Sequence, residues 1–192
     1  MRQRRHQRRV GMPTHPRTPP TRKTRTMSLS IYAVGPQRFI SFLKNLSSVL
    51  GKAAAHAEAH KWEEAALLGA RLYPDMFPMS RQVQIACDMA KGCCARLAGV
   101  EVPSHPDVEV SFADLQARIA KVIAFIESLP KESFEGSDTR MVALKVRGAD
   151  VSLSGESYLM DRTWANFHFH MTTAYALLRH NGVPLGKGDY LG

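Results

Sequence analysis

The sequence lacks a long apolar run and an export signal. Its 192 residues contain no apolar stretch near the roughly 20 residues that a transmembrane helix needs, which excludes an integral membrane protein. The basic N-terminus is not followed by an apolar segment, so the sequence predicts no signal peptide. With 44% hydrophobic and 22% charged residues, the composition is that of a globular protein and suits one domain plus a tail.

Cysteine is scarce, and its spacing fits neither a disulfide framework nor a zinc site. The three cysteines are Cys87, Cys93 and Cys94, an odd number without the paired spacing of a zinc ribbon. Adjacent positions on a helix point about 100° apart, which disfavours a bond between Cys93 and Cys94. We therefore expect reduced, half-buried thiols and a cytoplasmic protein.

The signatures of several large enzyme classes are missing. The sequence contains no glycine-rich phosphate loop, no Walker motif and no nucleophile elbow. These absences argue against a P-loop nucleotide-binding protein and against a serine hydrolase of the α/β type. Composition and motifs by themselves therefore name no reaction.

Acidic residues are absent from the first 26 positions, which hold nine lysines and arginines and four prolines. Residues 1–26 cannot bury enough apolar surface to form a core, so we expect a disordered basic tail. Three explanations stay open: translation that begins at Met27, an arm that binds nucleic acid, or a transit peptide. Residues 27–192 carry seventeen basic and seventeen acidic residues, so the predicted domain lacks the basic surface of a nucleic-acid-binding protein.

The predicted domain, residues 27–192, shows four long amphipathic patterns. Apolar side chains recur at steps of three and four, which is the period of a helix that buries one face. Pro36 lies in the first turns of the first pattern and predicts a kink there. The four predicted helices cover residues 30–60, 78–98, 112–129 and 157–181.

Before the last predicted helix, the hydrophobic period changes from that of a helix to that of a strand. Residues 140–155 alternate between apolar and polar side chains on both sides of Arg147 and Gly148, which predicts a short β-hairpin. Such a hairpin is marginal alone, so we expect it to lean on the helices. A shorter helix is expected over residues 62–68. The predicted fold class is therefore all-α, a four-helix bundle with a short β-hairpin inserted before the last helix.

A line of polar residues runs along the last predicted helix beside its core stripe. Thr163, Asn166, His170 and Thr173 follow the same spacing as the apolar residues next to them. A histidine on this line would lie in the bundle and would need a hydrogen-bond partner, for which a carboxylate such as Asp88 is a candidate. The predicted core stripe consists of Met160, Trp164, Phe167, Met171, Ala174 and Leu178.

Two further groups could carry chemistry. His56 and His60 are four residues apart, so a helix places them on one face, where they could bind zinc or simply form a solvated helix end. Cys87 and His170 could in principle act as a nucleophile and its base, but a buried inert thiol is the favoured interpretation.

Three segments are distinctive: PDMFP at residues 74–78, RQVQIACD at 81–88 and NFHFHMTTAY at 166–175. They resemble a bacterial family, the one numbered nineteen-ninety-three among the domains of unknown function. The resemblance extends from residue 27 to residue 192. That family is similar to the DinB-like, or YfiT-like, superfamily of four-helix bundles, whose members include metal-dependent transferases and isomerases that use thiols.

The resemblance implies a metal site. In the superfamily, one histidine of the second helix and two histidines of the fourth helix, four residues apart, hold the ion. His170 matches the second histidine of that pair, and Asn166 stands where the first would be. The position on the second helix falls near Cys87 or Asp88. The resemblance therefore implies His170, Asp88 and Asn166 as metal ligands, in a degraded site that binds a divalent ion weakly or not at all.

The resemblance also implies a homodimer that binds a small ligand in its helical cleft. As an enzyme, such a protein would be a metal- or thiol-dependent transferase. The competing hypothesis is a non-catalytic binding or stress-response module, and a third is association with nucleic acid through the basic tail. The sequence does not identify the ligand, the metal or the substrate.

Overall fold

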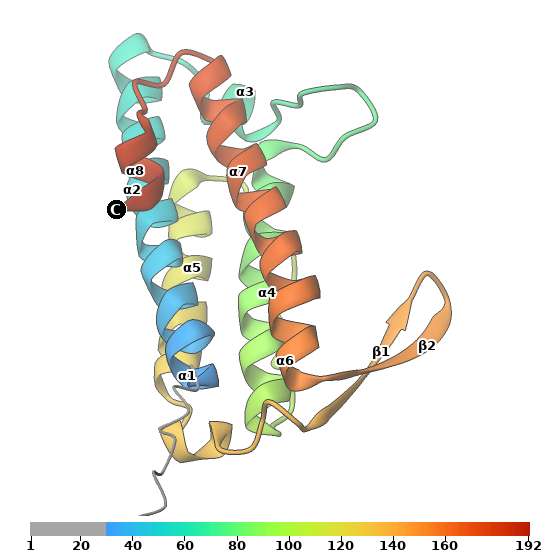
Figure 1. Cartoon of the computed structure of the whole chain (residues 1–192). Helices are drawn as coiled ribbons and strands as arrows, with labels where there is room; N and C mark the ends of the chain where they lie inside the picture. Colours follow the sequence, from blue (N-terminus) through green and yellow to red (C-terminus); the bar gives the residue numbers. More distant parts are fainter. Residues whose placement is uncertain (1–29) are drawn as a thin grey trace, which may run out of the picture.

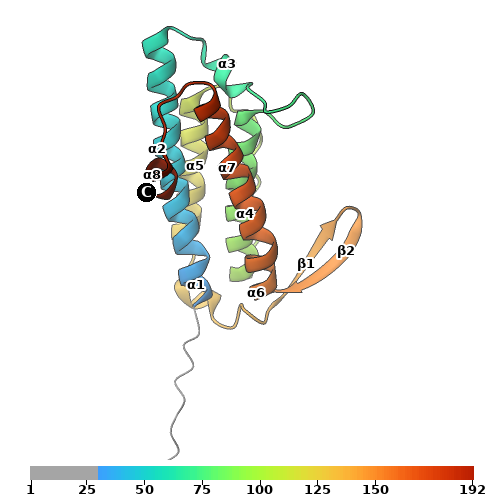
Figure 2. The ribbon, with the colours of Figure 1, turned by 45° about the horizontal axis from the view of Figure 1, so that its top comes forward.

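The computed structural model describes residues 30–192, so the predicted basic tail, residues 1–26, lies outside the described residues. Four long helices lie side by side and form a bundle (Figures 1 and 2). This arrangement confirms the predicted all-α bundle. The long helices are α2 (Pro36–His60), α4 (Met79–Ala98), α5 (Phe112–Glu127) and α7 (Trp164–His180).

The core lies between two helix pairs, α4 with α7 and α2 with α5. The side of α4 that faces the core carries small residues, among them Ala86, Ala90 and Cys93, and all three are fully buried. Small side chains let neighbouring helices approach closely, so α4 lies at the centre of the packing. Larger side chains, such as Phe39 of α2 and Phe167 of α7, fill the remaining space and meet edge to face at 5.1 Å between ring centroids.

The first predicted helix is divided in two. A short helix α1 (Ile31–Val34) ends at Gly35, and α2 begins at Pro36. Proline has no N–H to donate and its ring collides with the carbonyl four residues earlier, so it starts a new helix more readily than it continues one. The expected kink is therefore a break between two helices.

A π-helical turn precedes α7 and changes which side chains are buried. The chain forms α6 (Gly155–Ser157), then the π turn η2 (Tyr158–Thr163), in which the Thr163 hydroxyl donates to the Tyr158 carbonyl at 2.9 Å. A π turn holds more residues than an α turn, so the apolar stripe shifts by one position. Leu159 is fully buried while Met160 is 48% exposed, which corrects the prediction that Met160 belongs to the core.

The hairpin forms as predicted but leans little on the bundle. Strands β1 (Met141–Val146) and β2 (Ala149–Ser154) pair antiparallel, and Arg147 and Gly148 both adopt positive φ in the turn between them. The hairpin projects from the end of the bundle (Figure 1). Val142 is buried, and Leu144 and Leu153 are partly buried against the core, so the hairpin contacts the helices through these three side chains.

The connections contain three short helices. The expected helix over 62–68 appears as α3 (Glu64–Leu68), whereas η1 (Lys131–Phe134) and α8 (Lys187–Leu191) were not predicted. The C-terminal helix α8 packs against α2, where the Asn45 amide donates to the Tyr190 carbonyl at 3.2 Å. Within residues 30–192, no helix, long or short, has both the length and the apolar character needed to cross a membrane.

Candidate functional site

The predicted polar line of α7 lies against α4. Thr163, His170 and Thr173 are all buried, and Asn166 is half-buried. The hydroxyls of both threonines donate to carbonyls of nearby residues in the chain. Thr173 donates to the Phe169 carbonyl at 2.7 Å, and Thr163 donates to the Tyr158 carbonyl in the π turn. Asn166 and His170 make polar side-chain contacts with α4, and Thr163 also bonds the Cys93 thiol of that helix.

His170 is held in one orientation by a chain of two hydrogen bonds. Its Nδ1 lies 2.7 Å from Gln82 Oε1, and Gln82 Nε2 donates to the Phe77 carbonyl at 3.0 Å. Because the amide nitrogen faces the carbonyl, the amide oxygen must face the imidazole and accept its proton. The neutral ring therefore carries hydrogen on Nδ1 and a lone pair on Nε2.

Electrostatics keep this imidazole neutral. Burial lowers the pKa of His170, and the nearby positive charge of Arg81 lowers the pKa further. No hydrogen-bond partner for the Nε2 atom of His170 lies within residues 30–192. The side chain is 8% exposed, so the ring is not fully sealed from solvent. A neutral imidazole with a fixed tautomer and an open nitrogen can accept a proton or bind a metal ion.

The other two predicted metal ligands have different partners. Asp88 accepts hydrogen bonds from Lys91 at 2.8 Å and from Arg118 at 3.0 Å, and Asn166 donates to the Met89 sulfur at 3.1 Å. The structure therefore does not bring His170, Asp88 and Asn166 onto a common partner. Among the described residues, no group of three or more His, Cys, Asp or Glu side chains is arranged to hold a metal.

Helix geometry explains this separation. Gln82 and Met89 are seven residues apart, so both face α7, where they contact His170 and Asn166. Asp88 follows Gln82 by six residues, which places its side chain about 120° away around α4. Gln82 belongs to the distinctive segment RQVQIACD, but its pairing with His170 and that of Met89 with Asn166 were not predicted, although the seven-residue spacing of Gln82 and Met89 was the available signal.

All three cysteine thiols have raised pKa values. Burial raises the pKa of Cys87 to about 12 and that of Cys93 to about 12, and burial also raises the pKa of Cys94. A thiol with so high a pKa stays protonated at neutral pH and is a poor nucleophile. The favoured interpretation of Cys87 as an inert buried thiol agrees with these surroundings.

A second polar cluster joins α4, α5 and the irregular segment 100–111. Arg118 of α5 is almost fully buried and binds three carboxylates: Asp88 at 3.0 Å, Asp107 at 3.1 Å and Glu109 at 2.9 Å. It also donates to the Pro106 carbonyl at 3.1 Å. Such a set of bonds from one guanidinium fixes a long loop to the bundle, and sequence analysis did not single out Arg118.

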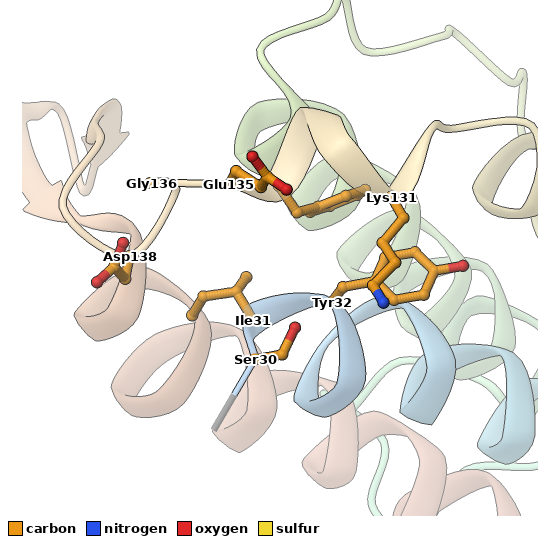
Figure 3. Close-up of a pocket in the computed structure, with 8 residues that line it drawn as sticks. Ser30, Ile31, Tyr32, Lys131, Glu135, Gly136 and Asp138 are labelled. Atoms are coloured by element: carbon orange, nitrogen blue, oxygen red, sulfur yellow. The ribbon is translucent and has the colours of Figure 1, made fainter. Parts of the chain in front are cut away.

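Surface cavities lie away from His170. One of about 270 Å³ lies where α1 meets η1, with the charged groups of Lys131, Glu135 and Asp138 around it (Figure 3). Another, of about 480 Å³, lies beside the Arg118 cluster and is lined partly by His105 and Lys121. Neither cavity contains a residue of the predicted metal set.

Three features define the class to which this chain belongs: the bundle, its inserted hairpin and the oriented histidine on the fourth long helix. Comparison with known proteins agrees with this class. The family described as a domain of unknown function (DUF1993) matches residues 31–191. The chain therefore belongs to this family.

The comparison with solved structures extends this assignment to the superfamily. The crystal structure of a DinB family member from Shewanella denitrificans is 41% identical in sequence and superposes with a TM-score of 0.80, covering 84% of this chain and 92% of that chain. The fold is thus DinB-like, as the resemblance implied. The search of curated proteins returned no match.

Proposed function

We propose that this protein binds a small ligand between α4 and α7, with Nε2 of His170 as the contacting atom. The observation that carries the proposal is the Phe77–Gln82–His170 chain of hydrogen bonds, which presents an unprotonated nitrogen. The bond to Gln82 leaves Nε2 as the ring nitrogen with a lone pair. Metal-binding and proton-accepting histidines are held in this way.

In the enzyme form of this proposal, the protein is a metal- or thiol-dependent transferase. His170 would bind a divalent ion or accept a proton from the attacking group. The thiol would have to be a substrate, since the thiols of Cys87 and Cys93 stay protonated. Asp88 bonds Lys91 and Arg118 through Oδ1, and Asn166 bonds Met89 through its amide nitrogen, so each would offer its remaining side-chain oxygen to the ion.

The second candidate is a binding module without catalysis. It is favoured by the placement of Asp88, whose carboxylate is paired with Lys91 and Arg118 rather than with His170 or Asn166. In this form His170 accepts a hydrogen bond from the ligand and no metal is needed.

Metal binding separates the two candidates. Protein without an affinity tag is stripped with a chelator, and its melting temperature is followed as Zn²⁺, Ni²⁺ or Mn²⁺ is added. The enzyme form predicts a rise that His170→Gln reduces and that His168→Gln, a matched change two residues away, leaves intact. An equal response of parent and His170→Gln would exclude the metal at this position.

The tautomer tests the proposal without a ligand. Nitrogen NMR of labelled histidine distinguishes the protonated from the unprotonated ring nitrogen. We expect His170 to be neutral at pH 7 with hydrogen on Nδ1, and we expect Gln82→Leu to abolish this preference. If Nε2 carried the hydrogen in the parent protein, the proposed contacting atom would be wrong.

We also propose that the protein acts as a homodimer in the cytoplasm. Three buried free cysteines suit a reducing compartment. Light scattering of the full chain would give the oligomeric state, and a monomeric mass at micromolar concentration would contradict the dimer.

A further inference from the structure

Two histidines and a tryptophan meet at the C-terminal end of α2. That end of α2 lies at the opposite end of the bundle from the hairpin (Figure 1). The ring centroids of His56 and His60 are 4.1 Å apart, and the Trp62 ring lies 5.2 Å from the first and 5.1 Å from the second. The two imidazoles share a helix face because they are four residues apart. This histidine pair belongs neither to the His170 site nor to the Arg118 cluster.

His60 has a fixed tautomer. Its Nδ1 lies 2.8 Å from the His56 carbonyl, which has no proton to give, so Nδ1 must donate. Nε2 of His60 is therefore the nitrogen with the free lone pair. Histidines that bind metals commonly donate their other ring hydrogen to a backbone carbonyl in this manner.

His56 has a nitrogen without a partner. Its Nε2 is buried and makes no hydrogen bond within the described part of the chain. The neighbouring backbone is that of Gly182, where even an added Cβ would remain 3.8 Å from this nitrogen. A buried polar atom left unpaired costs about 1–3 kcal/mol, so this nitrogen gains from any ligand that reaches it.

We propose that His56 and His60 form a binding site for one transition-metal ion, Cu²⁺, Ni²⁺ or Zn²⁺, with water in the remaining coordination positions. Imidazole nitrogens bind such ions at about 2.0–2.1 Å, so two imidazoles on one ion must lie side by side, as these rings do with centroids 4.1 Å apart. Cu²⁺ binds most tightly, since the affinity of nitrogen ligands rises to copper along the series.

The nearby carboxylates are not needed for this site. Glu64 accepts a hydrogen bond from the Phe112 backbone N–H at 2.8 Å and serves to anchor the start of α5. Two protein ligands plus water therefore describe the site, in keeping with the lack of a larger ligand group among residues 30–192. Trp62, which is 43% exposed, covers one side of the pair and provides an optical probe.

Calorimetric titration of Cu²⁺ into tag-free, chelator-stripped full-length protein tests the proposal. His56→Gln and His60→Gln should each weaken the affinity by roughly tenfold or more, because each removes one of two ligands. His180→Gln is the matched control, an exposed histidine on α7 that should leave the affinity unchanged. His6 and His15 of the tail remain in every variant, so their contribution cancels in the comparison.

Two further measurements separate this site from the others. Cu²⁺ should quench the fluorescence of Trp62, and Trp62→Phe should bind equally well but lose most of the quenching. His170→Gln should retain the tight binding step, so failure of the His170 proposal would not affect this one. Equal binding by the parent and the folded double variant His56→Gln/His60→Gln would overturn the proposal, as would loss of the step in His180→Gln.

Discussion

Replacing Arg118 with methionine should destabilise the protein more than any loss of a surface ion pair. The change keeps most of the apolar stem and removes the guanidinium. Arg118 then no longer binds Asp88, Asp107 and Glu109, nor the Pro106 carbonyl. Asp88 retains Lys91 at 2.8 Å, whereas Glu109 retains the uncharged Gln84 amide at 2.8 Å.

The expected loss follows from the burial of the charges. The Arg118 side chain is 2% exposed and that of Glu109 is 9% exposed, so water cannot replace the missing cation. Breaking a buried pair in this way costs about 3–5 kcal/mol in the free energy of unfolding. For a chain of this size, each kcal/mol lowers the melting temperature by about 2–4 °C, which gives roughly 6–20 °C in total.

Thermal and urea unfolding of both proteins at pH 7 measures the effect, with Lys44→Met as the matched control. Lys44 and Glu127 form an exposed pair at 3.8 Å, so the control should lose at most about 1 kcal/mol. The double variant Arg118→Met/Glu109→Gln should recover part of the loss, because the uncompensated carboxylate is then neutral.

The pH dependence has a defined sign. Burial raises the pKa of Glu109, but the hydrogen bond and charge of Arg118 outweigh burial and leave the pKa below its usual value. A lowered pKa in the folded state contributes stability above the unfolded pKa and loses it as the pH falls. The difference between parent and variant should therefore shrink below roughly pH 4. A loss under about 1 kcal/mol, or one independent of pH, would refute this account of Arg118.

Two further predictions concern the core. Ile119→Ala should lower the free energy of unfolding in urea by about 2–5 kcal/mol, because Ile119 is 1% exposed. Ile123→Ala should lower it less, because Ile123 is only partly buried. Equal losses would contradict the assigned buried face of α5. Cys87 and Cys93 should resist alkylation at pH 8 in the folded protein and react once the protein is unfolded, since burial raises both pKa values to about 12. Rapid labelling of the native protein would contradict their burial.

Much of the architecture is determined by the sequence itself. Helical periodicity locates the four long helices to within a few residues, because a helix that buries one face must repeat its apolar residues every 3.6 positions. The residues that begin and end helices could also be read from the sequence, because caps depend on neighbouring residues. Gly182 adopts the positive φ expected after a helix end, and Ser111 accepts a hydrogen bond from the Asp114 N–H at 3.1 Å. The turn at Gly148 likewise depends only on neighbouring residues.

Sequence periodicity reports which face of a helix is buried, but not which helix covers it. The polar line of α7 pointed correctly to a buried His170, yet its partner is Gln82 and not Asp88. That choice depends on how far α4 is rotated and shifted against α7, which no local pattern encodes. The exposure of Met160 has a related cause, since one π turn shifts the stripe by a residue.

The Arg118 cluster is the clearest case of a feature decided by tertiary structure. Arg118 lies at a position that its own helix pattern marks only as polar, and an arginine is usually exposed. It is buried because the segment 100–111 folds back over α5 and brings Asp107 and Glu109 to its guanidinium. The sequence by itself therefore determined the helices, their buried faces and the hairpin. Only the tertiary structure decided which polar side chains meet, because these pairs join different elements whose distance is set by packing and by the course of the loop.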